Sequence, residues 1–121
     1  MSRIGRGSII NISSSSALRA AGTLSSCASS KAALLHRGSV MALELAGKGI
    51  RVNTICPGNI ETDMQASLAD FEQVLLERTP MRRFGRPEDL DGARPLLASD
   101  AGRYMTGAVI TVDGGQTLAW I

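Results

Sequence analysis

A serine, a cysteine and a lysine at defined spacings are the residues of this chain with the clearest capacity for chemistry. Cys27 precedes Lys31 by four positions, and Ser14 lies thirteen positions before Cys27. Residues four apart on a helix share a face, so the Lys31 cation would favour the thiolate form of Cys27. Because a free thiol has a pKa of about 8.5, two readings stay open. Cys27 is either a reactive nucleophile or a small helix residue beside a solvated lysine.

The composition is that of one globular domain with an aliphatic core. The 121 residues are 44% hydrophobic but only 3% aromatic, and the net charge is +2 without a basic block. We therefore expect no nucleic-acid partner. The two cysteines lack CxxC spacing and the single histidine has no companion, which argues against a disulfide or a metal site. Without an apolar run of about 18 residues, the sequence predicts no membrane span and a cytoplasmic location.

Three short apolar runs predict the strands that would position these groups. Each is rich in β-branched residues and is bounded by glycine, proline or serine, as is typical of parallel strands buried on both faces. They are residues 8–13, 50–56 and 108–113. Between the first two, a helix over about 27–46 is expected, capped by Ser25 or Ser26 and ended by a glycine-rich turn at 47–49. This order is a right-handed βαβ unit.

Two further helical regions follow the second strand. Residues 60–81 carry apolar side chains at helical spacing and predict one or two amphipathic helices, through Met64, Leu68, Phe71, Val74 and Leu75. A last helix should begin at Pro87 and end near Ser99. Pro95 would then lie inside it and clash with the carbonyl of Asp91 at about 3 kcal/mol or more. We therefore expect a kink or an early end near Arg94.

The 27–46 helix carries two unfavourable residues on its expected apolar stripe. That stripe passes through Leu34, Met41 and Leu45, and it should also pass through position 37. Position 37 is an arginine, which must snorkel or face solvent. The neighbouring Gly38 costs a helix interior about 1 kcal/mol.

Five sequence blocks in one order resemble the C-terminal half of a short-chain dehydrogenase/reductase. They are Asn11-Ile12-Ser13-Ser14 with the helix reaching Lys31, Val52-Asn53, Pro57-Gly58-Asn59-Ile60-Glu61-Thr62, Gly85-Arg86-Pro87-Glu88-Asp89, and Val112-Asp113-Gly114-Gly115. The resemblance implies an α/β fold, the C-terminal half of a Rossmann-type doubly wound parallel sheet. Residues 1–121 would form a single partial domain whose three strands are the last three of seven. The family's glycine-rich pyrophosphate turn has no match, because Gly5-Arg6-Gly7 precedes a strand.

The resemblance also implies roles for individual residues. Ser14 matches the serine that holds the substrate oxygen, and Lys31 matches the lysine that lowers the tyrosine pKa and contacts the nicotinamide ribose of NAD or NADP. The position of that tyrosine is occupied by Cys27. The segment that contacts the nicotinamide in the family is matched by Pro57, Gly58, Ile60 and Thr62.

These matches predict an NAD(P)-dependent oxidoreductase of small alcohols or carbonyl compounds that is catalytically impaired. A thiol ends one bond beyond Cβ, short of a phenol oxygen, and losing a positioned acid or base typically costs on the order of 100-fold to 10,000-fold in rate. Two alternatives stay open at this point. One is a non-catalytic interaction protein, a homo-oligomer or another assembly formed through an exposed sheet edge. The other is a fragment whose true start lies upstream of Met1.

Overall fold

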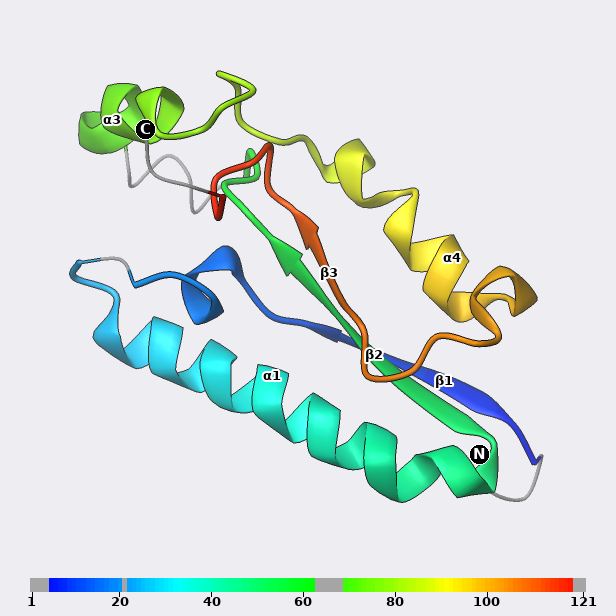
Figure 1. Cartoon of the computed structure of the whole chain (residues 1–121). Coiled ribbons are helices and arrows are strands. Elements are labelled where there is room, and N and C mark those ends of the chain that lie inside the picture. The colour runs from blue at the N-terminus through cyan, green and yellow to red at the C-terminus, as the bar shows by residue number, and fades with distance from the viewer. Residues whose placement is uncertain (1–4, 21, 63–68, 119–121) are drawn as a thin grey trace.

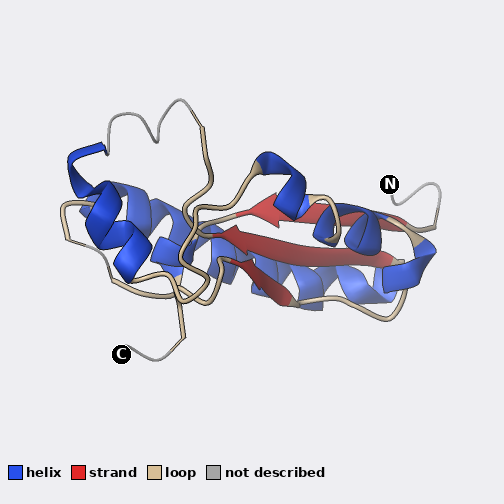
Figure 2. Cartoon of the chain, turned by 90° about the horizontal axis from the view of Figure 1, so that it is seen from above, coloured by secondary structure: helices blue, strands red, loops and turns tan. Residues whose placement is uncertain are grey.

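The computed structural model describes residues 5–20, 22–62 and 69–118, which form one parallel sheet flanked by helices. The strands are β1 (Gly7–Ile12), β2 (Ile50–Pro57) and β3 (Val109–Val112), in the spatial order β1-β2-β3. Both neighbouring pairs are parallel, with Gly7 opposite Ile50 and Thr54 opposite Val109. All three strands point toward the same end of the molecule (Figure 2). The predicted three-stranded parallel sheet is confirmed.

Helices cover the two faces of this sheet. Side chains alternate between faces along a strand, so Asn11 faces the long helix α1 (Ser25–Leu45) while the adjacent Ile10 packs in the cluster of Leu97 on α4 (Ala93–Ala98). Helix α1 lies along one side of the strands and α4 along the other (Figure 1). The molecule therefore has three layers, with the sheet in the middle.

The hydrophobic core lies between the sheet and α4. Its buried members are Ile55, Leu90 and Leu97, with partly buried aliphatic residues around them. The central strand β2 is buried almost throughout, but β1 is only half-buried and Ile12 is 42% exposed. The expectation that the first strand is buried on both faces is thus only partly met, because within the described residues β1 has a neighbouring strand on one side only.

Helix α1 has nearly the predicted length but not the predicted cap. Ser25 and Ser26 are helical residues, and the N-cap position is Leu24, which makes no side-chain capping hydrogen bond. The predicted serine cap is therefore wrong. At the other end, the 3-10 helix η3 (Ala46–Lys48) leads to Gly49 in the left-handed region, with φ 74°. The predicted glycine-rich stop is confirmed.

At Gly38 the helix α1 packs closely against the sheet. It is buried, and a Cβ added there would lie 2.9 Å from Asn11 Nδ2 and 3.1 Å from Thr54 Oγ1. Arg37 is exposed, as expected. The buried stripe therefore runs through Gly38 and Ala42. The helix-propensity cost of this glycine is offset by a close packing contact that a larger residue would obstruct.

The region after Gly85 is two short helices rather than one. The 3-10 helix η5 (Pro87–Leu90) is followed by a turn at 91–92 and then by α4. The helical region is interrupted before Arg94, so Pro95 is the third residue of α4. The first backbone N–H groups of a helix have no intrahelical acceptor, so the absence of an N–H at Pro95 removes no hydrogen bond of α4. The expected clash with Asp91 therefore does not arise.

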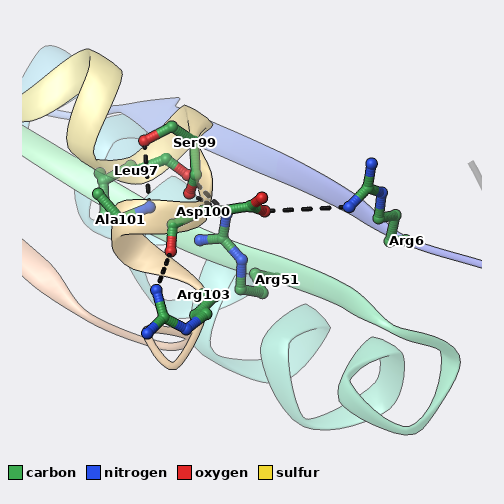
Figure 3. A network of polar contacts seen from close by, with 7 residues as sticks. All are labelled: Arg6, Arg51, Leu97, Ser99, Asp100, Ala101 and Arg103. Carbon is green, nitrogen blue, oxygen red and sulfur yellow. Dashed lines mark hydrogen bonds and ion pairs between the residues drawn. The ribbon is translucent and has the colours of Figure 1, made fainter.

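Arg51 on β2 satisfies the C-terminal end of α4. Its guanidinium donates to the carbonyls of Leu97 at 2.9 Å, Ser99 at 3.2 Å and Met105 at 3.3 Å. Around it, the 3-10 helix η6 (Asp100–Gly102) receives further arginine contacts (Figure 3). A cation at the last carbonyls also complements the helix dipole. The short α4 is thus fixed to the sheet by polar contacts as well as by its core side chains.

The segment predicted to contain amphipathic helices is described only in its second part. There the 3-10 helix η4 (Ala69–Phe71) leads into α3 (Glu72–Glu77), and Phe71 and Val74 are exposed. Met64 and Leu68 lie outside the described residues. In the part of the chain that the structure describes, no helix is long and apolar enough to cross a bilayer.

Candidate active site

The candidate site residues gather where the three strands end. Ser13 and Ser14 follow β1, Gly58 follows β2 and Asp113 follows β3. Parallel strands bring their carboxyl ends to the same edge of a sheet, where α/β proteins bind ligands. The beginning of α1 reaches the same edge through contacts with the 3-10 helix η2 (Ser15–Ala17). The sequence blocks that are far apart in the chain therefore share one end of the fold.

Ser14 is positioned by a turn that its own hydroxyl stabilises. It is the N-cap of η2, and its Oγ accepts hydrogen bonds from Ser16 N at 3.2 Å and from Ser16 Oγ at 3.0 Å. Among the hydrogen bonds of the described residues, none uses the hydroxyl proton of Ser14. This arrangement is compatible with holding a substrate oxygen, although the lone pairs of Ser14 already serve the turn.

Lys31 reaches back to the end of β1. Its Nζ donates to the Ile12 carbonyl at 3.1 Å, while Ser13 Oγ donates to the Lys31 carbonyl at 2.7 Å. Ser13 is 4% exposed and was not singled out from the sequence. The available signal was its position in the strand pattern, because Ser13 and Asn11 are two apart and so face the same helix. These two contacts join the strand end to the second turn of α1.

Cys27 lies exposed in the first turn of α1. Ser30 Oγ donates to its backbone carbonyl at 2.8 Å. Among the hydrogen bonds of the described residues, none joins the Cys27 thiol to Lys31. The structure therefore places the two on one helix, as predicted, but the lysine ammonium is engaged by the strand.

Cys56 is the second thiol near this edge, and it is fully buried at the end of β2. Burial raises its pKa, although hydrogen bonds to the Ser13 side chain and the Ser14 backbone partly oppose the rise. A raised pKa keeps the thiol protonated at neutral pH. Cys56 therefore acts as a core residue that supports Ser13 and Ser14 rather than as a nucleophile.

The segment from Pro57 to Thr62 is held by the next two loops. Gly58 N donates to the Val112 carbonyl at 3.0 Å, and a Cβ on Gly58 would lie 2.7 Å from Asp113 Cβ. Ile60 forms an isolated parallel bridge with Gly85. Pro57 is half-buried and Thr62 is exposed. Gly58 is therefore needed for packing against the β3 loop, and Ile60 and Thr62 are the members of this set that remain able to meet a ligand.

Asp113 organises the turn after β3. Its carboxylate accepts from Gly115 N at 2.9 Å, from Thr117 N at 2.8 Å and from Thr117 Oγ1 at 2.6 Å. Burial acts to raise the pKa of Asp113, but these hydrogen bonds outweigh it and the pKa is lowered. The block Val112-Asp113-Gly114-Gly115 is thus a self-capped turn that supports Gly58.

A cavity of about 210 Å³ opens beside this turn, lined among others by Ile60, Arg83, Asp89 and Asp113. Arg83 Nη1 lies 2.8 Å from Asp89 Oδ2. The hydrogen bond from Arg83, helped by the Arg86 amide, lowers the pKa of Asp89 to about 2. Both carboxylates are ionised at neutral pH, and Arg83, the arginine among the described residues that line the cavity, is paired with Asp89.

The residues of this chain do not fit a whole dinucleotide. Two carboxylates line the cavity, and Asp113 fills the space beside Gly58 that an open glycine would leave for a ligand. In the ranges that the structure describes, no glycine-rich turn that would hold a pyrophosphate lies between a strand and a following helix. What remains is the Lys31 side chain with the Ile60 and Thr62 positions, which could meet only one end of NAD or NADP.

Comparisons with known proteins agree with this geometry. Residues 1–117 match the family model described as Enoyl-(Acyl carrier protein) reductase. A 7alpha-hydroxysteroid dehydrogenase of Escherichia coli K12 is 42% identical over 117 residues, covering 95% of this chain and 46% of the relative. A 3-oxoacyl-(acyl-carrier-protein) reductase of Thermotoga maritima is 42% identical over 113 residues, covering 93% of this chain and 46% of the relative.

A solved structure shows the same arrangement. The gluconate 5-dehydrogenase of Burkholderia cenocepacia, in complex with NADP and tartrate, superposes with a TM-score of 0.94 at 36% identity. The alignment covers 98% of this chain and 48% of that one. The chain thus spans about half the length of the relatives it matches.

Proposed function

This chain belongs to the short-chain dehydrogenase/reductase family, and we propose that it is an NAD(P)-linked alcohol and carbonyl oxidoreductase by descent whose isolated 121 residues are catalytically impaired. One observation carries the proposal. Cys27 occupies the position that matches the family's tyrosine and is exposed, while the Lys31 ammonium donates to the Ile12 carbonyl. This arrangement supports the proposal that the chain lacks the family's proton-transferring pair.

The proposed impairment results from the short reach of the Cys27 side chain and not from the acidity of its thiol. A carbonyl oxygen that becomes a hydroxyl takes up one proton, which a side chain must deliver at hydrogen-bond distance. The sulfur of Cys27 is bonded directly to Cβ, whereas a phenol oxygen would lie several ångströms farther along a rigid ring. The Ser14 hydroxyl can still donate to a substrate oxygen, but it does not replace the missing acid.

The cofactor and substrate classes are part of the proposal. NADP is bound by the Burkholderia cenocepacia relative, which supports NAD or NADP as the cofactor here, with Lys31, Ile60 and Thr62 as the groups nearest its nicotinamide end. A small alcohol or carbonyl compound is the proposed substrate class. When bound, the cofactor supplies or accepts the hydride. A cytoplasmic location remains a prediction from the sequence.

The test is a hydride-transfer assay of the purified chain. NADH and NADPH are offered with a panel of ketones, NAD and NADP with the matching alcohols, and absorbance at the nicotinamide band is followed. We expect the same background rate for the natural chain and for Lys31→Ala, with the exposed Lys48→Ala as the matched control. Turnover that Lys31→Ala abolishes and Lys48→Ala preserves would refute the proposed impairment.

A further inference from the structure

Arg19 places a guanidinium across the carboxyl edge of the sheet. From its position we infer that the ligand of this site carries a carboxylate beside the alcohol or carbonyl group, with the carboxylate bound by Arg19 and the reacting oxygen held by Ser14. The inference rests on the proposed function and deepens it, because it narrows the substrate class to small hydroxy acids and their keto counterparts. Its test measures binding and not turnover.

The Arg19 side chain joins the loop after β1 to the turn after β3. Its Nε donates to the Thr117 carbonyl at 3.1 Å, a contact between residues 98 positions apart in the sequence. The strand β2 lies between β1 and β3, so a side chain that joins the segments after β1 and β3 spans the carboxyl end of β2. The guanidinium therefore lies over the edge where the candidate site residues gather.

Both ends of Arg19 are held by the protein. Its backbone N–H donates to the Ser15 carbonyl at 3.0 Å, at the end of the η2 turn that Ser14 caps. The Thr117 carbonyl that holds its side chain belongs to the turn that Asp113 stabilises. A donor whose orientation is fixed in advance loses less conformational entropy when it binds a ligand. Arg19 is thus oriented before a ligand is bound.

The donors of Arg19 suit a carboxylate. A guanidinium carries its N–H groups in one plane as a rigid fork, and it binds a carboxylate through two parallel hydrogen bonds. Among the hydrogen bonds and ion pairs of the described residues, the Arg19 side chain takes part only in the one with Thr117. Within this part of the chain, the N–H groups of its two terminal nitrogens are therefore available to a ligand.

The charges along this edge favour directed recognition over simple attraction. Lys31 is a second cation, but its ammonium is bound to the end of β1. Asp113 is ionised, and its carboxylate accepts from Thr117, the residue that also holds Arg19. Glu61 is exposed on the segment after β2. Because these acids offset the cations, an anionic ligand gains more from the paired hydrogen bonds of the guanidinium than from a net positive field.

Ser14 provides the second contact of the inferred ligand. Its Oγ accepts from Ser16, and no hydrogen bond within the described ranges uses its own proton. A ligand oxygen can accept that proton while a carboxylate of the same molecule binds Arg19. Both residues are attached to the η2 turn, so the fold sets their separation. A neutral alcohol would use only the serine.

A titration followed by NMR tests the inference on the purified, isotope-labelled chain. The probes are 2-hydroxybutyrate and 3-hydroxybutyrate, each compared with its amide, which has the same carbon skeleton and hydroxyl group but no charge. The signals followed are the Nε–H of Arg19 and the backbone amides of Ser14 and Ser16. Because hydrogen bonds to charged groups are the stronger ones, we expect at least one acid to bind about 5-fold or more tightly than its amide.

Substitutions of Arg19 separate its charge from its geometry. In Arg19→Gln the acid and its amide should bind equally. Arg19→Lys keeps the charge but not the planar fork, so it should retain only part of the preference for the acid. Arg37→Gln removes the same charge at an exposed position of α1 and should keep the full preference. If Arg19→Gln loses the circular dichroism of the natural chain, Arg19→Lys and the acid-to-amide ratio of the natural chain decide.

Equal binding of each acid and its amide by the natural chain, or no detectable binding of either, would overturn the inference. A preference that Arg19→Gln leaves unchanged would also overturn it, as would inorganic phosphate that binds at least as tightly as the better acid. Turnover decides none of these outcomes. Hydride transfer by the chain would refute the proposed impairment but not the carboxylate preference, whereas equal binding would refute the preference and leave the impairment standing.

Discussion

At the scale of single residues, the serine that the structure makes most important is not the one that the motif singles out. Ser13, buried beside Cys56, connects the end of β1 to α1 through the Lys31 carbonyl, whereas Ser14 mainly caps a short turn. Lys31 in turn binds the strand through its ammonium. The pair Ser13 and Lys31 therefore fixes where the candidate site begins, before any ligand is considered.

Ser13→Ala should lower the free energy of unfolding by about 1 kcal/mol, the usual net value of an intramolecular hydrogen bond. The buried hydroxyl is lost from both the Lys31 carbonyl and Cys56. Urea unfolding followed by circular dichroism measures the change. Ser26→Ala, at an exposed position of α1, is the matched control. Equal stability of the two variants would contradict this role for Ser13.

Asp89 should make the fold sensitive to acid. Its pKa in the folded chain is about 2, mainly because of Arg83, against an ordinary value of 3.8. Because the folded pKa is the lower one, the stabilisation is present above about pH 4 and is lost as the pH falls toward 2. Urea midpoints measured from pH 2 to 6 should fall more steeply for the natural chain than for Asp89→Asn.

The Asp89 effect should shrink in 1 M salt, because the pair with Arg83 is partly exposed and screening weakens it. Asp91→Asn, an exposed carboxylate in the adjoining turn, serves as the control. An acid response of Asp89→Asn that matches the natural chain would show that the Arg83 pair does not contribute.

At the scale of elements, close approach and helix termini account for residues that look unfavourable in the sequence. Gly38 lowers helix propensity, but the buried contact with Asn11 and Thr54 requires its small size. In the sequence Pro95 lies inside the expected last helix, but in the structure α4 starts only two residues before it. Arg51 then completes α4 from the sheet side (Figure 3). Each exception is explained by a tertiary contact or by a shifted helix boundary.

Gly38→Val should destabilise the chain by about 1 to 3 kcal/mol, the typical cost of overpacking a close contact. Its first side-chain carbon would already lie 2.9 Å from Asn11 Nδ2 before the two methyl groups are added. Ser39→Val introduces the same β-branched side chain at the next, exposed position of α1. Thermal and urea unfolding of both variants measure the difference. A Gly38→Val variant at least as stable as Ser39→Val would show that α1 can move away from the sheet.

At the scale of the whole molecule, the described residues form a sheet in which β1 pairs with a strand on one side only. The chain spans about half the length of the relatives it matches. The effect of the residue at position 27 on catalysis can be tested separately from the effect of chain length on folding. We expect a longer chain to bury more of β1, and a change at position 27 to bring a proton donor within reach of a substrate.

A chimera can test this separation. When the unmatched part of the Thermotoga maritima relative is joined to this chain, we expect the chimera to fold with little turnover. Adding Cys27→Tyr should raise kcat/KM by about 100-fold to 10,000-fold, the usual contribution of a positioned acid or base. Cys27→Phe, which adds the ring without the hydroxyl, should give no gain. High turnover in the chimera before the substitution would show that Cys27 is not the limiting defect.

The sequence alone determined the family, the three parallel strands, the long helix and the positions of Ser14, Cys27 and Lys31. These follow from local patterns: β-branched runs, helical spacing, and motif blocks whose order survives in the chain. The prediction failed at the cap of α1, whereas the expected interruption of the last helical region is present, at 91–92, a few residues before the position that was predicted. A helix boundary depends on one or two residues. When the boundary shifts by a few positions, a serine expected to cap the helix becomes a helical residue, and a proline expected in the interior lies in the first turn.

Only the tertiary structure decided which groups are already engaged. The Lys31 ammonium on Ile12, Ser13 under α1, Arg51 at the end of α4 and Asp113 beside Gly58 join residues that are 18 to 55 positions apart. Spacing along the chain cannot reveal such pairs, because the register of the strands and the approach of the helices bring them together. The sequence could name the residues of the site, but only the packed fold shows that its lysine is bonded to a strand carbonyl.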